Sequence, residues 1–309
     1  MRPRRAASTG ALLGVLLALL GAGLGALAGC GTGPAADPQP SAGTIRFASY
    51  DFAENQILTA VYAEGARREG LPVSLQAGVG TREIVEPALE QGVVDVVIDY
   101  VGTALSFVDG GRHDGGPPGE VHAALAEVMA PRGVAVLDAA RAEDQNGFAV
   151  SRTFSVAHRV TRLSDLAPLA PGLAFGGPPE CPDRPLCLPG LTEVYGLHFG
   201  QVFSMPSRSA TVEALVAGQI QVGLLETTDA RLGHAPVVLL ADDRALQPHE
   251  NVVPLVRTAV LDRWGDRLRE VLDDVSSRLT TPDLIRLNRA VEVEGLSPAD
   301  AAARWWDGA

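Results

Sequence analysis

A short sequence pattern occurs twice in this chain, at residues 88–100 and at residues 214–226. Each copy predicts the last turn of a helix, a glycine that ends the helix, a short apolar strand and a polar residue at the end of that strand. Glycine tolerates the left-handed conformation that closes many helices, and a run of β-branched residues suits a strand buried in a parallel sheet. The repeat therefore predicts two similar α/β halves.

The two copies end at Tyr100 and Glu226. In open α/β sheets, ligands bind beyond the carboxyl ends of the strands. Since both residues are expected at such a strand end, we expect their side chains to face a shared cleft between the two halves.

Strands and helices alternate along the rest of the chain. In the first half, strands are expected at residues 44–49, 71–76, 93–98 and 134–137. The helices between them give a βαβαβ order, which is typical of a parallel sheet with right-handed crossovers. Residues 147–151 and 251–257 are expected to form strands that leave the first half and return to it. Residues 262–279 are expected to form one helix with an apolar stripe.

The composition is that of a globular protein of 309 residues, with 46% hydrophobic and 20% charged residues. The net charge of -12 argues against nucleic-acid binding, because phosphates require neutralisation by Lys and Arg. Six histidines are present, but none lies in a metal-ligand spacing such as HExxH, and no Gly-x-Ser-x-Gly nucleophile motif occurs. We therefore expect no catalytic residues, no metal site and no cofactor.

The first residues resemble an export signal. Arg2, Arg4 and Arg5 precede an apolar stretch at residues 11–28, and the sequence Leu-Ala-Gly-Cys follows at its end, with the cysteine at Cys30. This order defines a signal peptide, and a cysteine at the cut resembles a bacterial lipobox. We expect residues 1–29 to be a lipoprotein signal peptide, Cys30 to carry a lipid that anchors the chain to the bacterial cell membrane, and residues 30–43 to be a flexible tether. The alternative is a transmembrane anchor, since about 20 apolar residues span a bilayer. Both place the folded part outside the cytoplasm.

Cys181 and Cys187 lie close together in a chain that is expected to be exported. This spacing suggests either a disulfide or half of a metal site. No neighbouring His or Cys completes a tetrahedral site in the sequence, so we favour the disulfide. Closing so short a loop contributes about 2.4 kcal/mol in the chain-entropy formula.

Several segments resemble the substrate-binding proteins of ABC importers for glycine betaine, choline and related osmoprotectants. They are TIRFASYDFAENQIL, TREIVEPALEQGVVDVVIDYVGTAL, GGPPECPDRPLCLPGLTEVYGL, ETTDARL and LQPHENVVPLVR. The resemblance covers nearly all of residues 44–305. It implies a periplasmic-binding-protein-like α/β clamp of two lobes, each a mostly parallel sheet flanked by helices, joined by two crossover strands. Lobe 1 would contain residues 44–146 and 251–309, and lobe 2 would contain residues 147–250.

The same resemblance implies a set of ligand contacts. A quaternary ammonium cannot donate hydrogen bonds and is held best by aromatic faces, each worth about 0.5–2 kcal/mol. The resemblance implies that Tyr100 is such a face, that Thr103 is a polar contact, that Arg184 meets a ligand carboxylate and that Asp144 faces the cation. On spacing alone, a packed aromatic at a strand end would be the favoured interpretation of Tyr100. Arg184 could equally be a surface arginine, and Asp144 could be a loop cap.

The chain departs from the family at three positions that commonly carry tyrosine, which here hold Asn146, Val212 and Glu226. Tyr50, near the end of the first expected strand, is a candidate second aromatic wall, and Asn146 is a candidate lining residue. Glu226 and Asp144 together favour a cationic ligand over zwitterionic glycine betaine, although an unpaired carboxylate is costly to desolvate.

These observations predict an extracytoplasmic solute-binding lipoprotein, monomeric, that delivers a quaternary-ammonium osmoprotectant to an ABC permease with its ATPase subunit. They leave open which solute is bound, and whether the clamp is retuned to another small molecule or used for sensing. An enzyme is a further alternative, because some transferases and dehydratases have similar folds and a fold does not fix a function.

Overall fold

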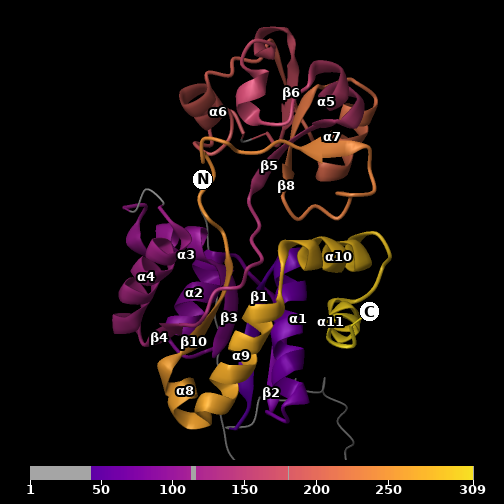
Figure 1. The fold of residues 1–309 in the computed structure, drawn as a ribbon. Helices are drawn as coiled ribbons and strands as arrows, with labels where there is room; N and C mark the ends of the chain where they lie inside the picture. The colour runs from indigo at the N-terminus through magenta and orange to yellow at the C-terminus, as the bar shows by residue number, and fades with distance from the viewer. Residues whose placement is uncertain (1–42, 113–115, 180, 309) are drawn as a thin grey trace, which may run out of the picture. The chain divides into compact units, whose positions relative to one another are not determined.

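The computed structural model describes residues 43–112, 116–179 and 181–308, and Figure 1 shows its fold. The predicted signal peptide, the predicted lipidation residue Cys30 and most of the tether lie outside the described residues. Within the described ranges, no helix is both long and apolar enough to cross a membrane.

The first sheet is built from the first half of the chain and one late strand. It contains β1 (Ile45–Tyr50), β2 (Val73–Gly80), β3 (Val96–Tyr100), β4 (Val134–Val136) and β10 (Val252–Arg257). The order across the sheet is β2-β1-β3-β10-β4. β1 runs parallel to β2 and β3, whereas β10 runs antiparallel to its neighbours β3 and β4. The predicted return of residues 251–257 to this sheet is confirmed.

The second sheet repeats this arrangement. It contains β5 (Asn146–Ser151), β6 (Ala174–Gly177), β7 (Gln201–Ser204), β8 (Val222–Glu226) and β9 (Val237–Leu239). The order is β7-β6-β8-β5-β9, with β6 parallel to β7 and β8, and β5 antiparallel to β8 and β9. Each sheet therefore has one antiparallel crossover strand, β10 or β5, beside its central strand.

The repeated sequence pattern occupies equivalent places in the two sheets. β3 and β8 are the central strands, and each follows a helix that ends in glycine. Gly92 and Gly218 have φ angles of 74° and 72°. The predicted left-handed helix ends are thus confirmed, and a side chain at either glycine would be strained.

Helices flank both sheets. Those of the first half are α1 (Ala53–Arg68), α2 (Arg82–Glu90), α3 (Val101–Asp109) and α4 (Pro118–Met129). Those that follow β5 are α5 (Arg152–His158), α6 (Leu188–Tyr195) and α7 (Arg208–Val216). The C-terminal helices are α8 (Thr258–Trp264), α9 (Asp266–Arg278), α10 (Thr281–Glu292) and α11 (Pro298–Trp306). α8 and α9 contact β10, and α11 packs against α1, so the C-terminal segment completes the first sheet's surroundings.

The expected single helix over residues 262–279 is wrong, because Gly265 divides it into α8 and α9. Gly265 has a φ of 61°, outside the helical region. The apolar stripe of α9 is present and buried, since Leu268, Leu272 and Val275 are 0% exposed.

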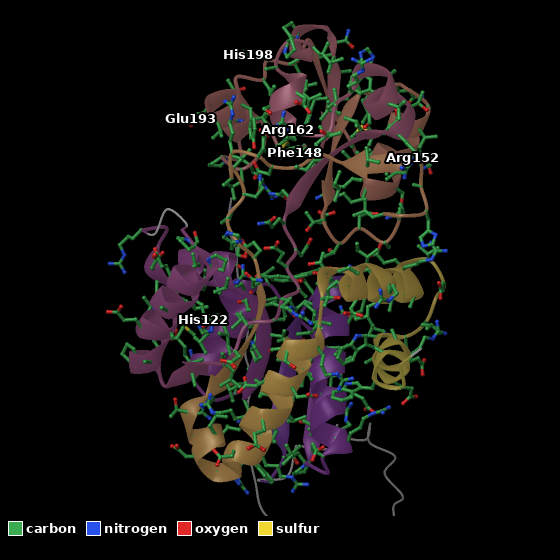
Figure 2. The ribbon with its side chains drawn as sticks, in the orientation of Figure 1. His122, Phe148, Arg152, Arg162, Glu193 and His198 are labelled. Carbon is green, nitrogen blue, oxygen red and sulfur yellow. A yellow bond between two sulfur atoms is a disulfide. The ribbon has the colours of Figure 1, made fainter. Side chains whose placement is uncertain are left out.

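Both faces of each sheet are covered by apolar side chains. Successive residues of a strand point to opposite faces, and Ile98 belongs to one apolar cluster of the first sheet while Val97 belongs to the other. In the second sheet, the ring centroids of Phe148 (β5; labelled in Figure 2) and Phe175 are 6.3 Å apart, while the next residue, Ala149, belongs to the opposite cluster. This two-sided burial leaves the strand ends as the places where polar side chains can gather.

Candidate functional site

Tyr100 and Glu226, the last residues of β3 and β8, both line one cavity of about 320 Å³. Thr103, Asp144 and Asn146 line it as well, so the structure brings together five of the residues singled out from the sequence. Asn146 opens β5 and lies opposite Glu226 in the antiparallel pair of β5 and β8. The cavity therefore lies where ligand sites of open α/β sheets are found.

Arg184 lines a neighbouring cavity of about 230 Å³ rather than the first one. Asn146 and Leu186 line both cavities, so the two are adjacent. Arg208 also lines the smaller cavity, which gives it two guanidinium groups. A ligand with a cationic and an anionic end could therefore place one end in each cavity.

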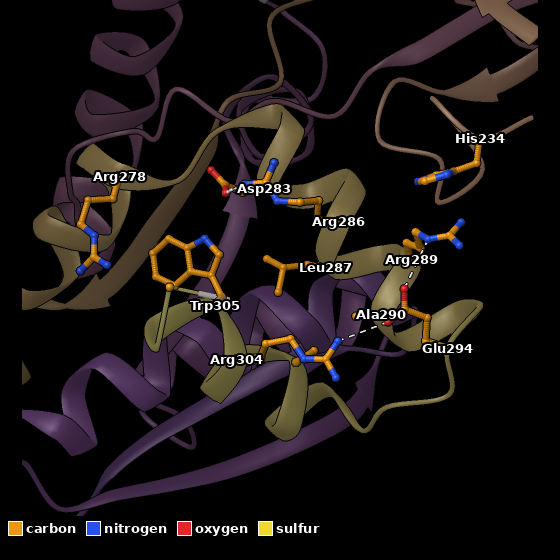
Figure 3. Close-up of a pocket in the computed structure, with 12 residues that line it drawn as sticks. His234, Arg278, Asp283, Arg286, Leu287, Arg289, Ala290, Glu294, Arg304 and Trp305 are labelled. Atoms are coloured by element: carbon orange, nitrogen blue, oxygen red, sulfur yellow. Dashed lines mark hydrogen bonds and ion pairs between the residues drawn. The ribbon is translucent and has the colours of Figure 1, made fainter.

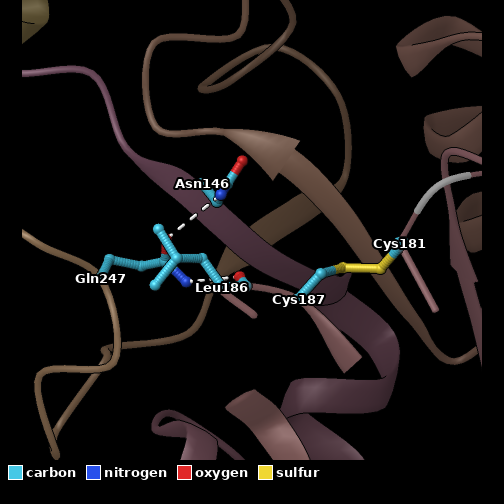
Figure 4. The surroundings of a disulfide bond; sticks show 5 residues. All are labelled: Asn146, Cys181, Leu186, Cys187 and Gln247. Atoms are coloured by element: carbon cyan, nitrogen blue, oxygen red, sulfur yellow. Dashed lines mark hydrogen bonds between the residues drawn. A yellow bond between two sulfur atoms is a disulfide. The ribbon is translucent and has the colours of Figure 1, made fainter. Parts of the chain in front are cut away.

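A disulfide joins Cys181 and Cys187 in the loop that carries Arg184 (Figure 4). Both cysteines are buried in the core of the second sheet. Gln247 ties the loop to β5, because its Nε2 donates to the carbonyl oxygen of Leu186 at 2.9 Å and its Oε1 accepts from Asn146 Nδ2 at 3.2 Å. The loop is thus held beside the strand that opens at the cavity.

Tyr50 is not among the described residues that line the cavity, but it stacks on Phe52, which is one of them. It is 2% exposed, and its hydroxyl donates a hydrogen bond of 2.6 Å to Asp99 Oδ2. Burial and the Asp99 carboxylate raise the pKa of Tyr50 well above its usual value. Val212 lies in the apolar cluster of α7, 7% exposed.

Phe52 provides the aromatic face that the sequence analysis assigned to Tyr50. Its ring stacks between those of Tyr50 and Tyr100, at centroid distances of 6.0 Å and 6.3 Å. It lines the cavity and is 43% exposed. Phe52 lies between the end of β1 at Tyr50 and the start of α1 at Ala53. This position beyond a strand end was the sequence signal from which Phe52 could have been predicted as a lining residue.

Tyr100 is held by a chain of hydrogen bonds that reaches the segment after β8. Its hydroxyl donates to Glu54 Oε1 at 2.6 Å. Asn288 of α10 donates from Nδ2 to Glu54 Oε2 at 2.6 Å and to the carbonyl oxygen of Thr228 at 3.0 Å. Burial and the Glu54 carboxylate raise the pKa of Tyr100 well above its usual value.

Acidic side chains outnumber basic ones among the described residues that line the cavity. Glu250 Oε2 accepts from the backbone nitrogen of Thr103 at 3.0 Å and from its Oγ1 at 2.9 Å. Burial raises the pKa of Glu250 to about 7. Burial and the nearby Glu54 raise the pKa of Asp144 well above its usual value. A cation placed beside these two carboxyl groups would favour their ionised forms.

The arginines of this region are already paired with other acids. Arg82, a lining residue, donates to Asp99 at 2.5 Å and 3.1 Å. Arg208 donates from Nε to both carboxylate oxygens of Glu226, at 2.7 Å and 2.6 Å. Asp144 also lines the cavity, and within the described part of the chain no arginine lies in salt-bridge range of its carboxyl group. The cavity therefore contains an acidic group that no described basic side chain balances.

Three residues that line the cavity were not predicted from the sequence: Phe52, Arg82 and Glu250. For Glu250 a signal existed, because it lies two residues before the returning strand β10. Val252 pairs with Tyr100, so residue 250 must lie just beyond the end of β3. No group of three or more His, Cys, Asp or Glu side chains in the described ranges could hold a metal ion.

Comparison with known proteins assigns the family. The family model OpuAC, described as the substrate binding domain of an ABC-type glycine betaine transport system, matches residues 43–308. The chain is 28% identical over 281 residues to a glycine-betaine-binding protein of Pseudomonas aeruginosa, with 85% of this chain and 86% of that protein covered. It is 24% identical over 277 residues to the glycine betaine-binding protein YehZ of Escherichia coli, with 86% and 90% covered.

A solved structure gives the same result for the fold. The crystal structure of a glycine betaine/carnitine/choline ABC transporter matches with a TM-score of 0.78 at 20% identity, covering 85% of this chain and 98% of that one. The two-lobe α/β fold predicted from the sequence is therefore confirmed. The chain belongs to the OpuAC family, the substrate-binding domains of ABC-type glycine betaine transport systems.

Proposed function

We propose that this chain binds a quaternary-ammonium solute of the glycine betaine and choline type in the cavity lined by Tyr100 and Glu226. The observation that carries the proposal is the pairing, in one cavity, of the exposed ring of Phe52 with the carboxyl groups of Asp144 and Glu250. A quaternary ammonium offers no N–H group, so it is recognised by aromatic faces and negative charge rather than by hydrogen-bond acceptors.

The charges favour choline over glycine betaine in the larger cavity. Choline carries only the positive charge, which the cavity's acids balance. Glycine betaine also carries a carboxylate, which would require Arg184 or Arg208, the two guanidinium groups of the smaller cavity. We therefore expect choline to bind more tightly, and betaines to depend on Arg184.

Calorimetric titration of the purified protein with choline, glycine betaine, carnitine, proline betaine and ergothioneine tests the proposal. Choline should bind most tightly and raise the unfolding free energy by about 2.7 kcal/mol at 100 times its Kd. Binding of ergothioneine without binding of any quaternary amine of the alkyl type would favour the alternative, a clamp retuned to another small molecule. The presence of Asn146 and Glu226 at positions where the family commonly carries tyrosine motivates this alternative.

We further propose that residues 44–146 and 251–309 form one lobe, that residues 147–250 form the other, and that the monomer delivers its solute to an ABC permease. Family membership supports delivery. The composition of the two sheets supports the boundaries to within one residue, because Asn146 already pairs with Glu226 in the second sheet. Loss of labelled choline uptake after deletion of the gene would distinguish transport from sensing.

Anchoring by a lipid on Cys30 is supported by the Leu-Ala-Gly-Cys sequence after the apolar stretch. A Cys30→Ala chain should lose the lipid adduct in mass spectrometry of the mature N-terminus. An unmodified Cys30 in the wild-type chain would contradict the anchor.

A further inference from the structure

A further cavity, of about 610 Å³, is lined by the C-terminal helices α9, α10 and α11 and by His234 from the loop between β8 and β9 (Figure 3). Its lining includes no residue of the cavity around Tyr100. Arginines from all three helices line it: Arg278 of α9, Arg286 and Arg289 of α10, and Arg304 of α11. This concentration of positive charge contrasts with the net charge of -12 of the chain.

The acids in this cavity are too few to balance the arginines. Glu294 is shared, since it accepts from Arg289 Nε at 3.3 Å and from Arg304 Nη1 at 3.2 Å. Asp283 pairs with Arg286 but also accepts from the backbone nitrogen of Thr280 at 2.9 Å, where it caps α10. Among the described lining residues, four guanidinium groups therefore face two carboxylates.

The guanidinium groups remain accessible to a ligand. The side chains of Arg286, Arg304 and Arg278 are 68%, 46% and 43% exposed. Arg278 also pairs with Asp274, which is itself 51% exposed and not among the described lining residues. Ion pairs this exposed are worth about 0–1 kcal/mol, so an anion of higher charge can replace these internal partners at little cost.

Apolar side chains form part of the cavity wall. Leu287, Ala290 and Ala301 are buried there. Trp305 lines the same wall, and the guanidinium of Arg278 lies over its ring at 5.0 Å. Stacking on an aromatic ring holds a guanidinium in a fixed plane. The guanidinium of Arg278 is therefore held in one orientation at the cavity.

We propose that this cavity binds a phosphate-bearing anion. Four guanidinium groups line one cavity, and a tetrahedral oxyanion can accept hydrogen bonds from such groups on several sides. A planar carboxylate offers a single fork, so it would leave most of these guanidinium groups without a bond to the ligand. The phosphate can come from a free phosphorylated compound or from the head group of an anionic lipid.

Two titrations of the full chain distinguish these sources. In the first, inorganic pyrophosphate is titrated by calorimetry. In the second, binding to phosphatidylglycerol vesicles is compared with binding to phosphatidylcholine vesicles, which corrects for any lipid anchor. The test variant is Arg286→Gln/Arg304→Gln. The control is Arg162→Gln (Figure 2), because Arg162 is 57% exposed and pairs with Asp165 three residues on, as Arg286 pairs with Asp283.

The test variant should weaken binding roughly tenfold or more, as expected when charge-assisted hydrogen bonds are lost, while Arg162→Gln should bind like the wild type. Pyrophosphate binding alone identifies a free phosphate compound, and preference for phosphatidylglycerol vesicles identifies a head group. No binding in either arm, or binding that the test variant retains, overturns the proposal. Choline affinity should be the same in all variants, so failure here is separate from failure of the proposed function.

Discussion

The hydroxyl group of Tyr100 donates a hydrogen bond of 2.6 Å to a carboxylate oxygen of Glu54. Both side chains are buried, with exposed fractions of 6% and 7%. A hydrogen bond to a buried charged group contributes about 1.5–3 kcal/mol to stability. Tyr100 therefore stabilises the empty protein as well as lining its cavity, and its replacement cannot be neutral for folding.

Replacing Tyr100 by Phe should lower the unfolding free energy by about 1.5–3 kcal/mol, because Glu54 loses a donor in a buried place. Urea denaturation measures this loss. Tyr62→Phe is the matched control, since Tyr62 is also buried but its hydroxyl bonds to the neutral hydroxyl of Ser276 at 3.0 Å. The control should lose about 0.5–1.5 kcal/mol. Equal losses in the two variants would contradict a stabilising role for the Glu54 carboxyl group beyond that of a neutral partner such as Ser276.

Replacing Phe52 by Ala should weaken choline binding several-fold, because an aromatic face contributes about 0.5–2 kcal/mol to holding a cation. The melting temperature of the empty protein should change little, since the ring is 43% exposed. Phe203→Ala is the control, because Phe203 of β7 is 44% exposed and does not line the cavity. Unchanged choline affinity in Phe52→Ala would show that the aromatic ring of Phe52 does not contribute to binding.

Choline affinity should rise several-fold between about pH 6 and pH 8. Burial raises the pKa of Glu250 to about 7, so this carboxyl group gains its charge in that range. Glu250→Gln should flatten the dependence, whereas Glu86→Gln should keep it, because Glu86 titrates near the same pH without lining the cavity. Identical pH profiles in the two variants would contradict a role for Glu250.

Stability should fall as the pH rises from about 4.5 to about 7, in part through Glu86. Burial raises its pKa to about 7 from the usual 4.5, and neither carboxyl oxygen has a hydrogen-bond partner in the described part of the chain. Between these values the folded state holds a proton that the unfolded state has released, so raising the pH favours unfolding. Each pKa unit corresponds to about 1.4 kcal/mol.

Glu86→Gln should therefore be more stable than the wild type at about pH 8 and similar to it near pH 4.5. Thermal unfolding at both pH values measures the difference. Glu83→Gln is the control, because Glu83 lies on the same helix but is exposed, and its pKa is lowered by a hydrogen bond from Thr81. A gain at high pH in the control as well would assign the effect to helix charge rather than to burial.

Removing the disulfide through Cys181→Ala/Cys187→Ala should lower the unfolding free energy by about 2.4 kcal/mol, the chain-entropy value for so short a loop. Glycine betaine binding should weaken more than choline binding, since this loop carries Arg184. Wild-type protein treated with a reductant keeps the side chains and serves as the control. Equal weakening of choline and glycine betaine binding would contradict a role for Arg184 in binding the carboxylate.

The strand ends at Tyr100 and Glu226 could be predicted from the sequence because local signals agree there. A glycine that must adopt positive φ and a β-branched run fix both the helix end and the strand, and the strand end fixes the polar residue. The break at Gly265 could not be predicted, because the apolar stripe continues through it and only the backbone conformation reports it.

The aromatic wall depends on tertiary packing and was harder to predict. Tyr50 and Phe52 are two residues apart, so they differ only in whether the residue lies in the strand or directly before the helix. The hydrogen bond from Tyr50 to buried Asp99 draws Tyr50 inward, and Phe52 is left at the cavity. Since Asp99 precedes Tyr100 on another strand, the choice between the two aromatics depends on strand pairing.

The position of β10 between β3 and β4 has a consequence for synthesis of the chain. The first sheet cannot close until Arg257 has left the ribosome, because β3 and β4 touch only through this late strand. An N-terminal fragment of any shorter length exposes two apolar strand edges. Such a nascent chain therefore keeps its first sheet incomplete over most of its translation.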